Sequence, residues 1–208
     1  MKADKIIFAT GNADKMREIQ MIMADLGLGI QSMKEAGIDM EIAENGTTFE
    51  ENAMIKASAI AQELKTRNVQ AIVLADDSGL EIDYLDKAPG VYSARYMGED
   101  TPYSVKNANL IKQLEGVPDE KRTARFVCVI AAVFPDGSSY TTRAAIEGRI
   151  GYEERGQNGF GYDPIFFLPE YGMYSAELAP EEKNRISHRG KALEEMKRVL
   201  KRAAEETI

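Results

Sequence analysis

An apolar run that leads directly into two acids is the feature that most constrains how this chain can fold. Residues 71–74 have the length and composition of a buried strand, and Ala75-Asp76-Asp77-Ser78-Gly79 follows at once. We expect the strand to end at the acids and the glycine to allow a tight reversal, which would hold the carboxylates rigidly at a sheet edge. Such a cluster can seat a hard divalent cation such as Mg2+. Taken alone, however, the pattern favours a plain acidic turn between two strands.

Composition narrows the class of protein. The chain has 208 residues, enough for one large domain or two small lobes around a shared core. Its single cysteine, Cys128, lies in the apolar run 126–130 and is expected in the core; one cysteine excludes an internal disulfide and fits a reducing cytoplasm. No apolar run has the length of a membrane span, and the start at Met1 lacks a signal-peptide pattern. The net charge of −8 argues against a nucleic-acid partner.

Helix and strand patterns interleave in the first half of the chain, whereas strands dominate the middle. We expect strands at 6–9, 71–77, 80–84, 125–134, 139–146 and 165–168, with a hairpin turn at 135–137. Helices are expected after Gly11, after Thr48, after Thr101 as cap, and at the end of the chain. Thr48 and Glu51 can form a capping box, and apolar residues share one face of two of these helices: Phe49, Ala53, Ile60 and Leu64 in the second, and Leu193, Met196, Leu200 and Ala203 in the last. This order predicts an α/β fold with a mixed sheet flanked by helices, not a purely parallel doubly wound one. The chain shows no repeat and no linker-like stretch, so residues 1–208 are expected to form one continuous domain.

A candidate phosphate site spans an expected strand-to-helix junction, Thr10-Gly11-Asn12-Ala13-Asp14-Lys15. The first N–H groups of a helix and its positive dipole end attract phosphate, and a glycine lets the phosphate come close. Lys15, in the first helical turn, would neutralise its charge. The pattern matches neither the P-loop nor the G-x-G-x-x-G motif, and a plain turn with an exposed lysine explains it equally well.

Three other stretches carry candidate side chains. Lys56 would share a helix face with Asn52 behind the loop residue Glu44, although a solvated charge face explains these residues too. The loop at 159–164 places glycines around two aromatic residues, which suits stacking of a base, or alternatively covers the core. His188 is the only histidine, and a lone histidine is more often structural, but it lies near Lys183 in an otherwise acidic protein.

The Asp77-Ser78-Gly79 triplet also matches the signature of aspartic proteases. Those enzymes need two such carboxylates, and only one copy of the triplet occurs here. The sequence therefore argues against a protease of this kind.

In their order and identity, the motifs closely resemble those of the inosine/xanthosine triphosphate pyrophosphatase family. The resemblance runs from Thr10 to about Leu193. It is carried by Thr10-Gly11-Asn12 with Lys15, Glu51-Asn52-Ala53 with Lys56-Ala57, Ala75-Asp76-Asp77-Ser78-Gly79-Leu80, Ala88-Pro89-Gly90 with Ser93-Ala94-Arg95-Tyr96, Phe160-Gly161-Tyr162-Asp163-Pro164, Glu182-Lys183-Asn184 and Ser187-His188-Arg189.

The family resemblance implies an activity and an architecture. The activity is Mg2+-dependent cleavage between the α and β phosphates of ITP, dITP or XTP, which yields the nucleoside monophosphate and pyrophosphate and cleanses the nucleotide pool. The architecture is an elongated mixed α/β structure of two lobes with the active site in a central cleft, usually a homodimer. No membrane or nucleic-acid partner is expected.

The resemblance also assigns roles to residues. Glu44 and Asp77 would bind the metal, and Asp77, with Asp76, would orient or deprotonate the attacking water. Which acid acts as base stays open, because both are assigned to one short turn. The phosphates would be bound by Thr10, Gly11, Asn12, Ala13, Asp14 and Lys15, and Lys56 and Lys183 would offset further negative charge on the phosphoryl oxygens. Ser78 would donate a hydrogen bond to the substrate. Phe160 would stack on the purine, with Gly161 beside it, and Tyr162, Asp163, His188 and Arg189 would read the edge of the base.

Two alternatives are weighed against this assignment. A pyrophosphatase for standard or modified pyrimidines, as in the structurally related septum-inhibitor family, is disfavoured by the motifs at 160–163 and 187–189. A non-enzymatic nucleotide-binding module predicts the loss of an acid among Glu44, Asp76 and Asp77, and all three are present.

Overall fold

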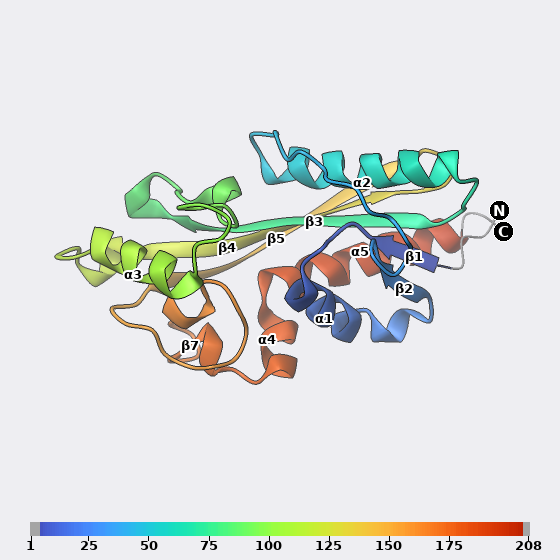
Figure 1. Cartoon of the computed structure of the whole chain (residues 1–208). Coiled ribbons are helices and arrows are strands. Elements are labelled where there is room, and N and C mark those ends of the chain that lie inside the picture. The colour runs from blue at the N-terminus through green and yellow to red at the C-terminus, as the bar shows by residue number, and fades with distance from the viewer. Residues whose placement is uncertain (1–4, 206–208) are drawn as a thin grey trace. The chain divides into compact units, whose positions relative to one another are not determined.

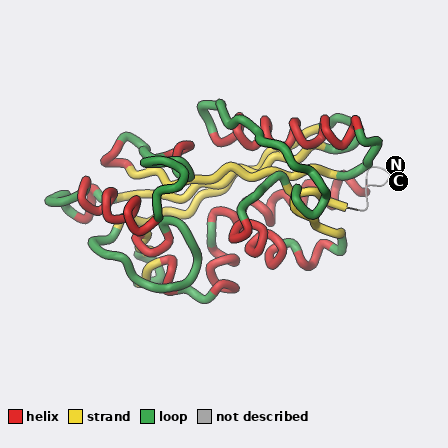
Figure 2. Tube along the Cα trace, viewed as in Figure 1, coloured by secondary structure: helices red, strands yellow, loops and turns green. Residues whose placement is uncertain are grey.

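The computed structural model describes residues 5–205, which form a mixed sheet covered by helices (Figures 1 and 2). The strands are β1 (Lys5–Phe8), β2 (Gly29–Ser32), β3 (Ile72–Ile82), β4 (Thr123–Val133), β5 (Ser139–Ile150), β6 (Phe166–Leu168) and β7 (Met173–Tyr174). The helices are α1 (Ala13–Ile22), α2 (Phe49–Thr66), α3 (Tyr103–Gln113), α4 (Pro180–Ile186) and α5 (His188–Glu205), and short 3-10 turns join several elements. None of the described helices is both long and apolar enough to cross a membrane.

The sheet has the strand order β2-β1-β3-β4-β5-β6-β7. β1 pairs in parallel with both β2 and β3, whereas β6 pairs antiparallel with β5 and β7. β4 and β5 are joined by the predicted hairpin turn, in which the Gly137 amide donates to the Phe134 carbonyl at 3.0 Å. The predicted α/β class with a mixed sheet is therefore confirmed.

The sequence prediction missed the short strands β2 and β7, and it divided β3 in two. We expected a strand that ends at Asp76 and Asp77, a reversal at Gly79 and a new strand from Leu80. Instead β3 is a single strand of 11 residues, and Gly79 does not take a left-handed conformation. The prediction of a turn was wrong because cations from three helices pair with the acids, and a paired acid can be buried inside a strand.

The helix ends follow the local sequence closely. α2 begins with the predicted capping box, in which Thr48 accepts from the Glu51 amide and Glu51 accepts from the Thr48 amide. α3 begins one residue later than predicted, with Pro102 as its cap. The Thr101 hydroxyl donates to the Met97 carbonyl at 2.7 Å, and the helix start has no side-chain cap.

By its internal contacts the chain divides into two compact units. The first contains the described residues of Met1–Asp77, Cys128–Ala144 and Arg189–Ile208, and the second contains Ser78–Val127 and Ala145–His188.

The first unit packs helices on both faces of its strands. One face of β1 and β3 presents Phe8 and Leu74, which join a buried cluster with Ile19 of α1 and Leu193 of α5. Figure 1 shows α2 on the opposite face of the strands from α1 and α5. The inward side of α2 carries buried residues, as predicted: Phe49, Ala53, Ile60 and Leu64. β1 and the first half of β3 are therefore buried on both faces, whereas β2 and the start of β5 are more exposed.

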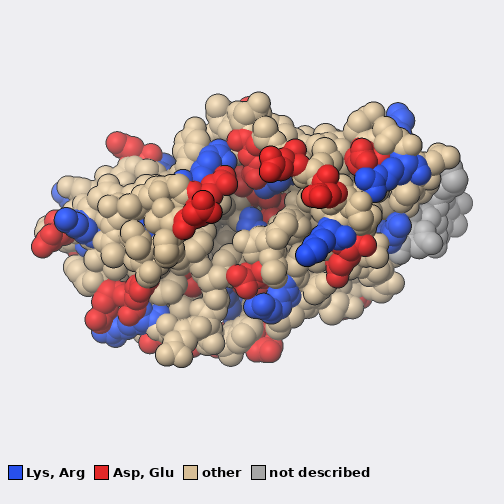
Figure 3. All heavy atoms as spheres, viewed as in Figure 1, with Lys and Arg blue, Asp and Glu red and all other residues tan. Residues whose placement is uncertain are grey.

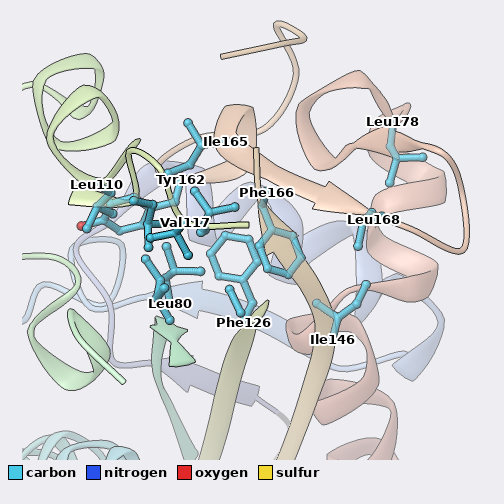
Figure 4. Packing of buried hydrophobic residues seen from close by; sticks show 14 of the residues in the cluster. Leu80, Leu110, Val117, Phe126, Ile146, Tyr162, Ile165, Phe166, Leu168 and Leu178 are labelled. Carbon is cyan, nitrogen blue, oxygen red and sulfur yellow. The ribbon is translucent and has the colours of Figure 1, made fainter. Parts of the chain in front are cut away.

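The second unit has its own core, centred on aromatic residues (Figure 4). The rings of Phe126 and Phe166 lie with centroids 4.4 Å apart, and Leu80, Tyr162 and Ile165 belong to the same buried cluster. This core supports the loop at 159–163, which contains several of the predicted site residues.

Candidate active site

Because side chains alternate along a strand, Asp76 and Asp77 point to opposite faces of β3. Asp76 has the same parity as Leu74, so it points toward α1 and α5. Asp77 has the parity of Val73 and Ala75, so it points toward α2. The two neighbouring acids consequently have different partners, and each partner set comes from different helices.

Asp76 is fully buried between two cations. Its Oδ2 atom lies 2.9 Å from Nζ of Lys15 and 3.3 Å from Nη2 of Arg189. Arg189, itself buried, also donates to the carboxylate of Glu18. Burial alone would raise the pKa of Asp76, but the charges of Lys15 and Arg189 hold that pKa well below its ordinary value. Asp76 is thus a permanently ionised part of a buried ion-pair chain.

Asp77 faces a second lysine and a second acid. Nζ of Lys56 lies 2.8 Å from the Glu44 carboxylate and 3.9 Å from Oδ1 of Asp77. Burial raises the pKa of Asp77 to about 6. The positive charges of Lys56 and Lys15 and a hydrogen bond from Asn52 oppose this rise in pKa, whereas the negative charge of Glu44 adds to it. Two carboxylates therefore converge on one ammonium group.

The loop before α1 is held in shape by its own side chains. Oδ1 of Asn12 accepts from the amides of Asp14 and Lys15 at 2.9 and 3.0 Å, and the Asn12 amide donates to the Thr10 hydroxyl at 3.2 Å. Gly11 and Asn12 are exposed, so the loop is open to an anionic ligand. Asp14 pairs with Arg17 on the surface.

In the second unit, a buried acid organises the 159–163 loop. Oδ2 of Asp163 accepts from the Phe160 amide at 2.9 Å and from Nζ of Lys183 at 2.6 Å, and Oδ1 accepts from the Ser175 hydroxyl at 2.8 Å. Nζ of Lys183 also lies 5.0 Å from the centre of the Phe160 ring. An aromatic ring and an ammonium group are thus fixed beside each other.

Tyr162 and His188 are largely buried in the same unit. The Tyr162 hydroxyl donates to the Ser93 carbonyl at 2.7 Å, and the ring meets Tyr103 edge-on at 5.2 Å. His188 stacks on Phe126 with the ring centroids 4.9 Å apart. Both side chains are therefore held by contacts inside the second unit.

The comparisons with known proteins agree on one family. A sequence model of the Ham1 family matches residues 6–199. The chain belongs to the Ham1 family. This confirms the family resemblance predicted from the motifs.

Several relatives of this Ham1 chain are named for an activity or have a solved structure. A protein of Clostridium perfringens named dITP/XTP pyrophosphatase is 48% identical over 198 residues, which cover 95% of this chain and 97% of that protein. The structure of a HAM1 protein from Coxiella burnetii has a TM-score of 0.84 and 40% identity, and the match covers 95% of this chain and 98% of that one. A nucleoside-triphosphatase / dITP/XTP pyrophosphatase from Mycobacterium abscessus has a TM-score of 0.71 at 39% identity, covering 92% of this chain and 98% of that one.

The structure sorts the predicted site residues of this Ham1 chain between its two units. The first unit brings together the 10–15 loop, Glu44, Lys56, Asp76, Asp77 and Arg189. The second contains the 160–163 loop, Lys183, His188 and Ser78, which is half-buried in β3.

Three residues in contact with the site are absent from the sequence-based assignment. Glu18 bonds Arg189, Asn52 stabilises the ionised form of Asp77, and Ser175 bonds Asp163. Glu18 lies three residues after Lys15 and Asn52 four residues before Lys56, so helical spacing offers a signal for both. Ser175 lies in an irregular segment, and no local pattern singles it out.

The carboxylates on the α2 side fit a magnesium ion. No group of three or more histidine, cysteine, aspartate or glutamate side chains suited to holding a metal occurs within residues 5–205. Mg2+, however, commonly uses only one or two protein carboxylates when substrate phosphates supply other ligands. Glu44 and Asp77 form such a pair, because both approach the same lysine ammonium group.

The charges on one face of the molecule are mixed in sign. On the face shown in Figure 3, acidic and basic side chains are interspersed, and those of the described residues do not gather into one basic patch. This agrees with the net charge of −8.

Proposed function

We propose that this chain hydrolyses deaminated purine nucleoside triphosphates, namely ITP, dITP and XTP, to the nucleoside monophosphate and pyrophosphate. The observation that carries the proposal is the acid pair of β3, in which Asp76 and Asp77 lie on opposite faces and each approaches its own lysine. Relatives that match nearly the whole chain are named dITP/XTP pyrophosphatase. The resemblance of the motifs points to the same reaction.

The phosphates would be bound by the cations and amides of the first unit. Lys15 and Lys56 approach Asp76 and Asp77 from opposite faces of β3, and both ammonium groups are only slightly exposed. A triphosphate carries more negative charge than Asp76 and Asp77 together. The exposed 10–15 loop presents the backbone amides of Gly11 and Ala13 at a helix start, since Asn12 already accepts from those of Asp14 and Lys15. We assign the phosphate grip to Thr10, Gly11, Asn12, Ala13, Asp14 and Lys15, with Lys56.

The two acids take different roles in this proposal. Asp76 is a fixed counter-charge, because Lys15 and Arg189 enclose it. Asp77 would accept the proton of the attacking water or orient that water, because it borders the Glu44 and Lys56 side chains instead of a closed ion-pair chain. Asparagine at position 77 could not take the proton.

We further propose that the reaction uses Mg2+ held by Glu44 and Asp77. When bound, such an ion offsets the negative charge of the phosphoryl oxygens and helps to position the triphosphate. The protein's own part is to hold the two carboxylates near each other, with Lys56 between them until the substrate arrives.

The base would be recognised by the second unit. Phe160 would stack on the purine, and Gly161 allows a close approach. The family resemblance gives Lys183 to the phosphate charge, but its ammonium group lies beside the Phe160 ring, so we propose it as a donor to the base instead. Hypoxanthine and xanthine carry a 6-oxo group that accepts a hydrogen bond from an ammonium donor, whereas adenine carries a donor there. Guanine shares the 6-oxo group, so its rejection must act on its 2-amino group.

The remaining base-edge assignments stay proposals. Tyr162, Asp163 and His188 would shape the region around the base, and Ser78 would donate a hydrogen bond to the substrate. Arg189 belongs to the first unit, where it pairs with Asp76 and Glu18, and its contact with the base edge is proposed on the family resemblance alone. The polar groups of Tyr162 and Asp163 already have protein partners. They are therefore well placed to fix the geometry of the pocket.

Three proposals about organisation rest on the family resemblance. We propose a homodimer, a cytoplasmic location and a single pyrophosphatase domain over residues 1–208. The last is supported by β3, β4 and β5, each of which contains residues of both units. Light scattering after size-exclusion chromatography tests the dimer.

A substrate panel tests the activity. The protein is incubated with Mg2+ and ITP, dITP, XTP, dGTP, ATP or dTTP, and the products are separated. Monophosphate and pyrophosphate from the first three substrates only is the expected result. Orthophosphate release or equal turnover of dGTP would contradict the proposal, and turnover of dTTP would favour the pyrimidine alternative. Asp77→Asn should abolish turnover, whereas Asp136→Asn, in the exposed β4–β5 turn, should not.

A further inference from the structure

Both oxygens of the Asp163 carboxylate accept hydrogen bonds from inside the protein. The residue is only 3% exposed. Oδ2 is shared by the Phe160 amide and the Lys183 ammonium group, while Oδ1 accepts from the Ser175 hydroxyl at 2.8 Å. The orientation of this carboxylate therefore fixes the backbone of Phe160 and the position of Lys183 at the same time.

Ser175 is held firmly by its surroundings. It is 5% exposed and begins a short 3-10 turn, Ser175–Glu177. That turn is tied to the 156–161 loop, because the Asn158 amide donates to the Ala176 carbonyl at 2.9 Å and the Asn158 side chain donates to the Leu178 carbonyl at 2.9 Å. The hydroxyl of Ser175 is thus presented to Asp163 from a braced segment.

Gly159 shows how little space the carboxylate has. A Cβ atom on Gly159 would lie 2.3 Å from Oδ2 of Asp163 and 3.1 Å from Nζ of Lys183. Its φ of +73° also suits glycine. The loop therefore closes tightly over the Asp163–Lys183 pair, and the Ser175 hydroxyl contacts the pair from the segment that follows β7.

We propose that Ser175 is a positioning residue for purine recognition, acting through Asp163 on Phe160 and Lys183. The proposal rests on the proposed function, since it names what holds the base-binding groups in place. Without the hydroxyl, Oδ1 of Asp163 becomes a buried acceptor that has lost its donor, and such a group turns toward other donors. The shared hydrogen bonds on Oδ2 then weaken, and the ring and the ammonium group lose their fixed relation.

This role predicts a specific kinetic signature. The groups assigned to the phosphates and the water belong to the first unit, so chemistry after binding should be unchanged. Ser175→Ala should raise KM for dITP about tenfold, as expected for loss of one hydrogen bond to a charged group, and should leave kcat within about twofold. Ser175→Cys keeps the side-chain volume but has a weak donor, so it should behave like the alanine variant.

The matched control removes a hydroxyl elsewhere. Thr142 of β5 donates to the Ala192 carbonyl at 2.9 Å and is also partly buried. Thr142→Val should leave KM for dITP unchanged. Thermal midpoints of all variants are measured alongside the kinetics, and those of both Ser175 variants should stay within a few degrees of the original protein.

A second measurement does not depend on turnover. Hydrogen exchange of the Phe160 amide, followed by NMR, reports directly on its bond to Asp163. Exchange at this amide should become faster in both Ser175 variants and stay unchanged in Thr142→Val.

The outcomes separate the two levels of the proposal. Higher KM with unchanged kcat and faster Phe160 exchange in both variants supports the role of Ser175. Unchanged KM, a rise in KM without faster exchange, a parallel fall in kcat and thermal midpoint, or a cysteine variant that behaves like the original protein each overturns it. If the unaltered protein fails to hydrolyse dITP, the proposed function falls, and the exchange result alone decides whether Ser175 positions the loop.

Discussion

Asparagine substitutions at the two neighbouring acids of β3 should change stability in opposite directions when metal and nucleotide are absent. In Asp76→Asn, the buried chain of charges loses the acid that Lys15 and Arg189 share. In Asp77→Asn, a buried charge that burial and Glu44 disfavour is replaced by a neutral group. The first variant should therefore be less stable than the original protein, and the second more stable.

The magnitudes follow from the surroundings of each acid. Raising the pKa of Asp77 from an ordinary 3.8 to about 6 corresponds to about 3 kcal/mol of stability lost at pH 7.5. Because the neighbourhood relaxes around a neutral side chain, we expect a gain of about 1–2 kcal/mol. Removing one partner of a buried ion pair costs about 3–5 kcal/mol. Arg189 keeps Glu18 as a partner, so for Asp76→Asn we expect a loss of about 2–3 kcal/mol.

The sign depends on pH in a defined way. Between pH 3.8 and about 6, the folded protein binds more protons at Asp77 than the unfolded chain does, so the stability contributed by this residue falls as pH rises and is lost above about 6. For Asp76 the folded pKa is lowered, so its contribution is complete above its ordinary pKa of 3.8 and is lost on acidification. At pH 7.5 both effects are fully expressed.

Urea unfolding at pH 7.5 in the presence of EDTA, followed by far-UV circular dichroism, measures both changes. The slope of the transition should be the same for all three proteins, so that the midpoints report stability directly. The reasoning about opposite faces would be refuted if both variants lost similar amounts of stability, or if Asp77→Asn were less stable than the original protein.

Three further predictions concern groups away from the proposed reaction. The Cys128 thiol should not react with a disulfide reagent in the folded protein at pH 8, because burial raises its pKa to about 12; rapid labelling before unfolding would contradict this. Arg122→Met should lower the free energy of unfolding by about 3 kcal/mol, because three backbone carbonyls would lose their buried donor, and an unchanged thermal midpoint would count against it. Hydrogen bonds from Arg125 hold the pKa of Asp83 well below its ordinary value, so Asp83→Asn should cost about 1 kcal/mol at pH 7 and progressively less below pH 4; a difference that grows on acidification would refute this.

Sequence patterns correctly predicted those parts of the fold that depend on neighbouring residues. The capping box of α2, the apolar face of α5 and the hairpin between β4 and β5 depend on residues a few positions apart. The same holds for the order of the motifs, which identified the family before any geometry was known. The sequence therefore predicted the mixed sheet and gathered the candidate residues.

Contacts between distant segments could not be read in this way. β3 continues through its two acids because Lys15 and Arg189, far away on either side in the chain, supply the opposite charges. Once the strand is continuous, alternation separates Asp76 from Asp77, which a single acidic turn could not do. Ser175 was missed for the same reason, since only the folded chain brings it to Asp163.

The division of the chain has a consequence for the order in which the protein is made. The first unit includes β1, which precedes the second unit in the chain, but it also needs parts of β4 and β5, and α5, which follows both of them. The second unit ends at His188, before the rest of α5 has been synthesised. During synthesis from the N-terminus, the unit that begins first is therefore completed last. Until α5 is synthesised, the apolar cluster that it shares with β1 and α1 lacks part of its cover, and exposed apolar surface of this kind makes a partly folded chain prone to aggregation.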